Sequence, residues 1–523
     1  MTSWDGMTPD IRQLKNWPSW VSVGCHARLS RQPDLNLCGN GSGMMSVDSR
    51  LFAPTLTLLS DQHKDKIHQA ALTILTEVGM KVLHEQALEL LAAAGCRVEN
   101  DHIVKIPSDR VLQAIDSTPK NIAVYDRQAN HCMDVGGRRA YFGTGSDLIF
   151  SHDAINNERH TCVLEDVCRA ARVADALPNI DFIMSFAHPS DCPPQLAYLA
   201  SFQAMAANSS KPIVSTARGR EDLAQMWQIC CVLRGSAERL REKPLMIHYS
   251  DPISPLKHPF YSLDKLLYCA ETSVPLVYSA APIAGTTAPM TIAGHVAQGL
   301  AECLCGLVIH QLKSKGAPFV MGMGPAVLDM ATGECSYNAP EFLLSLQAII
   351  EMSHYYDLPS WGYAGTTDAQ IPDEQAVFEA GLETFIAAMA GSNLNHDVGY
   401  MDFGRTGSLE LMVILDEVID QVRRLSRGIP VDDDMLALDV IREAGFEGDF
   451  LTHPHTLKHL RPTQWRPGLI SRMGYEEWQS AGGTSLRERS RKKVQDILRD
   501  HRPAPIPARQ VREIQKIVDQ FAS

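Results

Sequence analysis

The chain has 523 residues, of which 45% are hydrophobic, so it can form one very large core or two ordinary ones. Its net charge of -13 argues against nucleic acid as the main partner, because phosphate binding needs a concentrated basic surface, and suits a cationic ligand only weakly. No apolar run reaches the ~20 residues of a membrane span, and the thirteen cysteines contain no CxxC pair. Since an export signal is also lacking, we expect a cytoplasmic protein that binds neither nucleic acid nor membrane.

The first 135 residues contain two kinds of sequence. Residues 1–55 are rich in Gly, Ser and Asn, and we expect a flexible extension there. Residues 56–135 combine two helical patterns, 59–79 and 87–95, with short apolar runs that predict strands near residues 103–106 and 122–125. We expect this part to form a small α+β lead-in.

Between residues 136 and 430, short apolar runs alternate with helical segments. Eight runs are strand candidates, and a proline introduces five of them, which suits a first strand position where no donor is required. The runs are 140–142, 181–187, 212–216, 244–249, 275–279, 318–322, 360–363 and 393–397. Their spacing fits a strand, a helix and two loops, and eight such units close a (β/α)8 TIM barrel, an α/β fold. An open doubly wound sheet is the alternative, but no G-x-G-x-x-G motif stands in the required context.

The segment 275–324 is the clearest of these units. Its first run has no polar alternation, as expected for a parallel strand buried on both faces. From Met290 to residue 313, apolar side chains recur every three or four residues, which predicts a helix that packs on the sheet. Gly316 ends this helix, and a second buried strand follows.

Residues 431–523 leave the alternating pattern, and we expect a helical C-terminal extension there. Its basic cluster, residues 487–493, is either a nucleic-acid patch or, as we favour, a solvated helix face or a docking site for an acidic partner. The helix-rich tail also makes a homo-oligomer plausible.

In a TIM barrel, chemistry is expected where the strands end. These positions carry aromatic, glycine and amide residues, without a strand lysine for a Schiff base, a G-x-S-x-G elbow or a two-histidine-plus-carboxylate metal set. Trp361, Tyr363 and Tyr400 are placed to present ring faces to a cation, which is how a quaternary ammonium group without N–H donors is held. The alternative is that these rings simply fill the barrel.

Several segments carry a resemblance to a known family. They are Phe-Gly-Thr-Gly-Ser-Asp at 142–147, Leu-Pro-Asn-Ile-Asp-Phe at 177–182, Ala-Pro-Ile-Ala-Gly-Thr-Thr-Ala-Pro at 281–289, Pro-Asp-Glu-Gln-Ala at 372–376 and the later segment 451–460. In this order they resemble the trimethylamine methyltransferase family of corrinoid-protein methyltransferases. The resemblance implies a (β/α)8 barrel whose members move a methyl group from a methylated amine to the cobalt of a separate corrinoid protein.

The resemblance also guides the choice of substrate. The family's archetype carries pyrrolysine at the barrel mouth, whereas this chain has only standard residues in the corresponding region, which we place near residues 365–370. The members without pyrrolysine resemble glycine betaine methyltransferase. Because a quaternary ammonium releases a neutral tertiary amine, it needs no acid to leave. We therefore expect a quaternary amine such as glycine betaine as the substrate.

Under this hypothesis the site residues take two kinds of role. The catalytic and charge-balancing candidates are His396, which orients the substrate, together with Asp147 and Asp368. The substrate-binding candidates are Trp361, Tyr363, Tyr400, Phe142 and Gln370. His396 is alternatively a core histidine bonded to the backbone, and Asp147 is alternatively a helix cap.

We expect no tightly bound cofactor and no metal. The Asp-x-His-x-x-Gly pattern of proteins that bind a corrinoid base-off is absent, since Asp61-Gln62-His63 is followed by Lys66, so the corrinoid must come from a cognate partner protein. Trimethylamine demethylation without pyrrolysine, a quaternary-amine sensor and, more distantly, a barrel aldolase or lyase remain alternatives.

A histidine-rich segment in the C-terminal extension is the remaining candidate for a ligand site. His453, His455 and His459 suggest a metal, because the last two lie one helical turn apart. No cysteine or carboxylate close in sequence completes the set, and the family resemblance implies no metal there. We therefore favour a role at a helix start and in packing.

Overall fold

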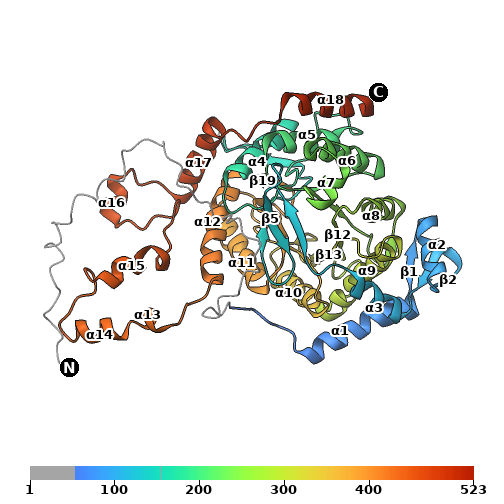
Figure 1. Ribbon diagram of the computed structural model, residues 1–523, viewed down its shortest axis with the longest axis horizontal. Helices are drawn as coiled ribbons and strands as arrows, with labels where there is room; N and C mark the ends of the chain where they lie inside the picture. Colours follow the sequence, from blue (N-terminus) through green and yellow to red (C-terminus); the bar gives the residue numbers. More distant parts are fainter. Residues whose placement is uncertain (1–53, 155, 523) are drawn as a thin grey trace. The chain divides into compact units, whose positions relative to one another are not determined.

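The computed structural model describes residues 54–154 and 156–522 (Figure 1), so the expected extension 1–55 lies almost entirely outside the described residues. Seven parallel strands form one sheet in the order β6-β17-β16-β13-β12-β10-β9. Their bounds are β6 Tyr141–Phe142, β9 Ile213–Ser215, β10 Met246–Ser250, β12 Leu276–Ala280, β13 Phe319–Met323, β16 Ser360–Tyr363 and β17 Leu394–His396.

The segment 181–187 closes this sheet into a barrel. Phe182 pairs in parallel with Gly143, just beyond β6, and Ile183 pairs with Ile213 of β9. Phe186 has a positive φ of 63°, so the extended backbone is interrupted before a longer strand can form. The eight expected runs therefore lie in sequence order around a closed (β/α)8 barrel, and the predicted fold class is confirmed.

Helices surround the strands, as Figure 1 shows. They are α4 Leu164–Ala176, α5 Ala197–Asn208, α6 Arg220–Arg234, α7 Ala237–Glu242, α8 Phe260–Thr272, α9 Ile292–Lys313, α10 Pro340–Tyr355, α11 Glu374–Ala390 and α12 Leu409–Ser426. Within the described residues, α9 alone has the length and hydropathy of a membrane span, but 83% of that window is buried inside the protein. It is the central core helix that its apolar periodicity predicts.

The lead-in packs against the barrel at two places. Helices α1 (Asp61–Thr73), α2 (Glu85–Ala93) and α3 (Ser108–Ser117) accompany strands β1 (Met80–Val82), β2 (Arg97–Val98) and β3 (Ile103–Lys105), and β1 also pairs with β11 (Lys257–His258) of the barrel chain. The hairpin of β4 (Ile122–Tyr125) and β5 (His131–Val135) lies at the amino-terminal end of the strands. There, the Tyr125 amide donates to the carbonyl of Pro244, which precedes β10, at 2.9 Å.

This hairpin fills one end of the barrel. Its apolar side chains belong to the same buried cluster as the inward-facing residues of the strands. The hairpin contributes Ile122, Val124, Met133 and Val135, and the strands contribute Val214, Ile247, Val277, Val320 and Leu394. The opposite end, where the strands finish, carries the polar and aromatic residues.

Two small sheets decorate the carboxyl end of the barrel. Strands β18 (Tyr400–Met401), β19 (Thr406–Ser408), β7 (Phe150–His152) and β8 (Arg159–Thr161) form one of them, so the loops after the first and eighth barrel strands are joined. The hairpin of β14 (Val327–Leu328) and β15 (Cys335–Ser336) forms the other, after β13.

The basic cluster of residues 487–493 lies on helix α17 (Leu486–Asp500), which packs against α12. Arg491 Nε lies 2.7 Å from an oxygen of Glu410, and Arg487 Nε lies 3.5 Å from the other oxygen. Lys493 lies 3.8 Å from Asp416, which is on α12 like Glu410. Since Glu410 is fully buried, much of the cluster serves an ion-pair network between helices, which the sequence did not reveal.

The remaining helices of the C-terminal extension are short. They are α13 Asp433–Leu436, α14 Leu438–Ala444, α15 Pro454–Thr463 and α16 Tyr475–Ser480, and none of the four contains a buried residue. The chain closes with α18 (Ala508–Ala522), which packs on α6.

Candidate active site at the carboxyl end of the barrel

His396, the last residue of β17, lies at the centre of an aromatic cluster. Its imidazole stacks on the Trp361 indole with ring centroids 4.4 Å apart and planes at 21°. The Tyr363 ring lies 4.3 Å away and the Tyr249 ring 6.5 Å away. These residues come together because Trp361 and Tyr363 are two positions apart on β16 and therefore share the inner face. The imidazole covers one face of Trp361, so that face is not open to a ligand.

Asp397 holds the imidazole in place. Its carboxylate accepts a hydrogen bond from Nδ1 of His396, because an ionised carboxylate can only accept. Asp397 has a positive φ of 77°, which ends the extended backbone of β17. The sequence pattern did not single out this aspartate, and only its position beside His396 at a strand end pointed to it.

Gly145 makes room for this pair. A Cβ atom at Gly145 would overlap both the Asp397 carboxylate and the phenol of Tyr400. The Tyr400 hydroxyl donates to the backbone carbonyl of Ser146. Gly145 is therefore required because the loops that follow the first and eighth strands approach each other closely there.

Four tyrosines surround the same centre, and two of them, Tyr249 and Tyr337, were not predicted as site residues. Burial raises the pKa of Tyr249, Tyr363 and Tyr400 well above the usual value, and burial also raises the pKa of Tyr337. All four hydroxyls are therefore neutral at physiological pH. Tyr249 was missed as a site residue, although its place two residues after Ile247 puts it on the inner face of β10.

Two buried polar atoms in this cluster, Nε2 of His396 and Nε1 of Trp361, have no hydrogen-bond partner within the described part of the chain. The Ser279 hydroxyl is buried beside them and interacts with the hydroxyl of Tyr249. Ser279 and Trp361 flank Gly322. A Cβ atom at Gly322 would lie 3.0 Å from the Cβ of Ser279 and 2.9 Å from the Cβ of Trp361. Buried polar groups are normally satisfied, so this arrangement is typical of a site that receives a polar ligand.

Carboxylates dominate the rim. Asp147 lies 3.6 Å from Nδ1 of His188, and a hydrogen bond to this carboxylate raises the pKa of His188. Asp251 follows β10, and burial raises its pKa. Lys265 donates to the backbone carbonyl of Ala217 at 2.8 Å, and burial lowers its pKa. This balance of charges favours a cationic ligand over an anionic one.

The remaining predicted residues have other positions. Asp368 accepts hydrogen bonds from the Ser336 hydroxyl and from the Tyr337 amide, the latter at 3.0 Å, so it ties the β14–β15 hairpin to the loop after β16. Gln370 is exposed and donates to the carbonyl of Asp368. These hydrogen bonds fix the loop after β16, and the roles of Asp368 in charge balance and of Gln370 in substrate binding stay predictions.

The predicted position of Phe142 in the substrate site requires a correction. It is fully buried among residues of the outer, helix-facing cluster, with the guanidinium of Arg423 over its ring at 5.6 Å. Side chains alternate along a strand, so Tyr141 faces the barrel interior and its neighbour must face the helices. Phe142 therefore packs α12 onto the sheet and does not line the site.

The fold defines the protein as a TIM-barrel protein, and its candidate site is formed by side chains at the carboxyl ends of several strands. The trimethylamine methyltransferase (MTTB) family model matches residues 43–521, and the chain belongs to this family.

Relatives of this chain include a trimethylamine methyltransferase MttB of Desulfitobacterium hafniense, which is 30% identical over 421 residues and covers 80% of this chain and 84% of the relative. A glycine betaine methyltransferase of the same species is 27% identical over 402 residues, with 76% and 84% covered. Among solved structures, the monomethylamine methyltransferase MtmB of Methanosarcina barkeri matches with a TM-score of 0.46 and 16% identity, covering 86% of this chain and 96% of MtmB.

Proposed function

We propose that this protein transfers a methyl group from a quaternary amine, such as glycine betaine or a related betaine, to the cobalt(I) of a partner corrinoid protein. The observation that carries the proposal is the barrel-mouth cluster, in which His396, held by Asp397, is surrounded by Trp361, Tyr363 and Tyr249. Membership of the trimethylamine methyltransferase family supports the reaction class. The corrinoid belongs to the partner, and no resident cofactor is needed.

The chemistry of the leaving group favours a quaternary amine. When a methyl carbon of a tetraalkylammonium is attacked, the C–N bond breaks, its electron pair goes to nitrogen and a neutral tertiary amine departs. Attack on a methyl carbon of neutral trimethylamine would release an amide-like anion. That release requires activation that standard side chains here do not supply. The carboxylates of Asp147, Asp251 and Asp397 at the mouth balance the positive charge of the substrate.

The side chains bind, orient and exclude water, without forming a covalent bond to the substrate. The rings of Tyr363, Tyr249 and Tyr400 attract the cation through their faces, which is worth about 2 kcal/mol or more where water is removed. His396 orients the substrate, and the unpartnered Nε1 of Trp361 is available to a polar tail. The cobalt(I) electron pair forms the new Co–C bond, so the products are methyl-cobalt(III) and the tertiary amine.

The test is an anaerobic spectrum of a cognate corrinoid protein reduced to cobalt(I) and mixed with this protein and one amine at a time. The panel contains glycine betaine, carnitine, proline betaine, choline and trimethylamine. Loss of the cobalt(I) band and growth of the methyl-cobalt(III) band with one quaternary amine is the expected result. A response to trimethylamine alone would refute the argument from the leaving group, and tight binding without methyl transfer would place the protein among sensors.

Site variants make this test specific to the barrel mouth. His396→Ala is expected to abolish most of the methyl transfer, whereas His63→Ala, an exposed residue of α1, should leave the rate unchanged. Equal rates for the two variants would remove His396 from the mechanism. Asp147→Asn is expected to weaken amine binding more than it slows the methyl transfer, because this carboxylate balances charge at the rim.

Two further properties of the protein are part of the proposal. A cytoplasmic location is supported by buried free thiols such as Cys230, Cys269 and Cys303, which suit a reducing compartment. Self-association through the C-terminal extension is supported by exposed apolar side chains there, among them Leu438 and Phe446. Light scattering of the full chain tests the second point, since a monomer at all concentrations would refute it.

A further inference from the structure

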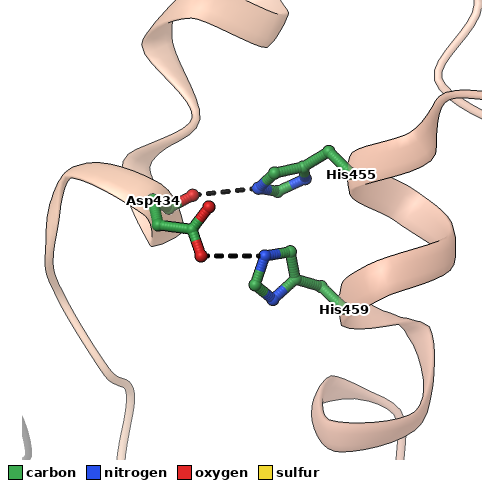
Figure 2. A group of neighbouring side chains, drawn as sticks. All are labelled: Asp434, His455 and His459. Atoms are coloured by element: carbon green, nitrogen blue, oxygen red, sulfur yellow. Dashed lines mark hydrogen bonds and ion pairs between the residues drawn. The ribbon is translucent and has the colours of Figure 1, made fainter.

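Helices α13 and α15 bring two histidines and a carboxylate together, far from the barrel mouth in the chain (Figure 2). His455 and His459 are four residues apart on one face of α15, with ring centroids 4.3 Å apart. Both Nε2 atoms point at Asp434: that of His455 lies 2.9 Å from its backbone oxygen, and that of His459 lies 3.2 Å from its carboxylate.

The three side chains offer a set of ligand atoms that suits a transition metal. The nitrogen and carboxylate oxygen atoms all lie within 4.8 Å of one another. Four ligands at about 2.0–2.1 Å around zinc stand about 3.3 Å apart, so small side-chain rotations bring the three atoms to ligand distance. Nε2 of His459 is buried, and its contact with the Asp434 carboxylate lacks hydrogen-bond geometry, so its lone pair is open to a metal ion.

The surrounding structure gives a reason for a metal at this place. None of the helices α13 to α16 contains a buried residue, so no apolar core joins α13 to α15. Segments without a core of their own are commonly held together by a metal or by disulfides. The cluster connects residues 434 and 459 across a loop of the chain, which is how a structural metal stabilises a small unit.

We propose that Asp434, His455 and His459 form a zinc-binding site that clamps α13 to α15, with water as the fourth ligand. The carboxylate that the sequence did not provide next to the histidines comes from residue 434, about twenty residues earlier in the chain. His453 does not belong to the set, because its Nδ1 accepts the amide hydrogen of His455 and so caps α15. The site is independent of methyl transfer at the barrel.

Lys458 competes with the metal. Its Nζ lies 2.7 Å from the same Asp434 oxygen and neutralises the carboxylate when no ion is bound. The Lys458 side chain is 62% exposed, so its ammonium group can move into water when zinc takes the oxygen. Removing this amine should therefore strengthen zinc binding, which is the opposite of what removing a ligand does.

The experiment is a titration of the full chain, first treated with chelator, with Zn2+ by calorimetry and with Co2+ by visible spectroscopy. One equivalent is expected to bind, with the intense d–d bands of a tetrahedral cobalt site. His459→Ala and Asp434→Asn should each weaken binding by about 100-fold. The matched controls His63→Ala and Asp433→Asn, which remove a surface histidine and the neighbouring carboxylate, should leave it unchanged.

Two results would overturn the proposal. One is the absence of measurable zinc binding to the wild type. The other is tight zinc binding that His459→Ala does not reduce. Lys458→Gln provides the independent check, because tighter binding of Zn2+ supports the site and unchanged or weaker binding contradicts it. As a structural readout, Zn2+ should slow amide hydrogen exchange in α13 and α15 and leave exchange in the barrel unchanged.

Discussion

Gly145→Ala is a one-methyl test of the active-site architecture. The new Cβ would overlap the Asp397 carboxylate and the Tyr400 phenol, so the carboxylate must retreat by more than about 1 Å to reach an ordinary contact distance. That movement breaks the hydrogen bond from His396 Nδ1 to Asp397. The imidazole then loses the partner that fixes its orientation above the substrate.

The size of the effect follows from the kind of bond that is lost. A hydrogen bond to a charged group contributes about 1.5–3 kcal/mol, and each 1.4 kcal/mol is a factor of ten, so methyl transfer should slow by about 10- to 150-fold. Overpacking adds a stability cost of about 1–3 kcal/mol, which leaves a folded protein. Gly474→Ala is the matched control, because its backbone φ is -63° and no atom lies within 4 Å of its Cβ.

The assay is the initial rate of cobalt(I) loss with the best quaternary amine, with circular dichroism to confirm that each variant is folded. A slow Gly145→Ala variant has two explanations, the lost hydrogen bond between His396 and Asp397 and the added bulk. Asp397→Asn separates them, since it weakens this hydrogen bond without adding bulk. If Gly145→Ala is folded and as fast as Gly474→Ala, the position of the Asp397 carboxylate does not matter for the reaction. That outcome would refute the role assigned to the pair.

Two further predictions concern stability. Burial raises the pKa of Glu383 well above its value of 4.5 in a free chain, so the fold favours the neutral acid and stability is lost as pH rises above that value. Glu383→Gln should therefore gain stability relative to the wild type between about pH 5 and about pH 8 in urea unfolding, and parallel curves would contradict this. Arg491→Ala should cost about 2 kcal/mol by leaving the buried Glu410 carboxylate poorly paired. Lys492→Ala, whose partner Asp496 is on the surface, should cost less than about 1 kcal/mol in the same measurement.

The barrel could be predicted because its signal is repeated. Of the eight regularly spaced apolar runs, seven correspond to the strands of the barrel sheet, and the eighth, 181–187, bridges Gly143 and β9. The placement of His396, Trp361, Tyr363 and Tyr400 together at the strand ends follows from the same pattern. Their chemical roles are proposals that rest on this geometry.

The features that the sequence pattern could not provide have a common physical cause. Phe142 was chosen for its place in a motif, but strand alternation turns it toward α12, and the same alternation turns the missed Tyr249 inward. Asp368 and Gln370 lie in a loop whose hydrogen bonds depend on a hairpin about thirty residues away in the chain, which no local pattern encodes. Contacts between distant segments, such as Asp434 with His459, have no sequence signature either.

The β4–β5 hairpin has a kinetic consequence for a methyl transfer at the barrel. Because it stops the amino-terminal end, the amine and the corrinoid protein of the proposed reaction would both use the entrance at the carboxyl end. Under the proposed reaction, we therefore expect the small substrate to enter first and the docked partner to close the chamber. This arrangement predicts a compulsory order, in which the demethylated amine leaves after the partner departs.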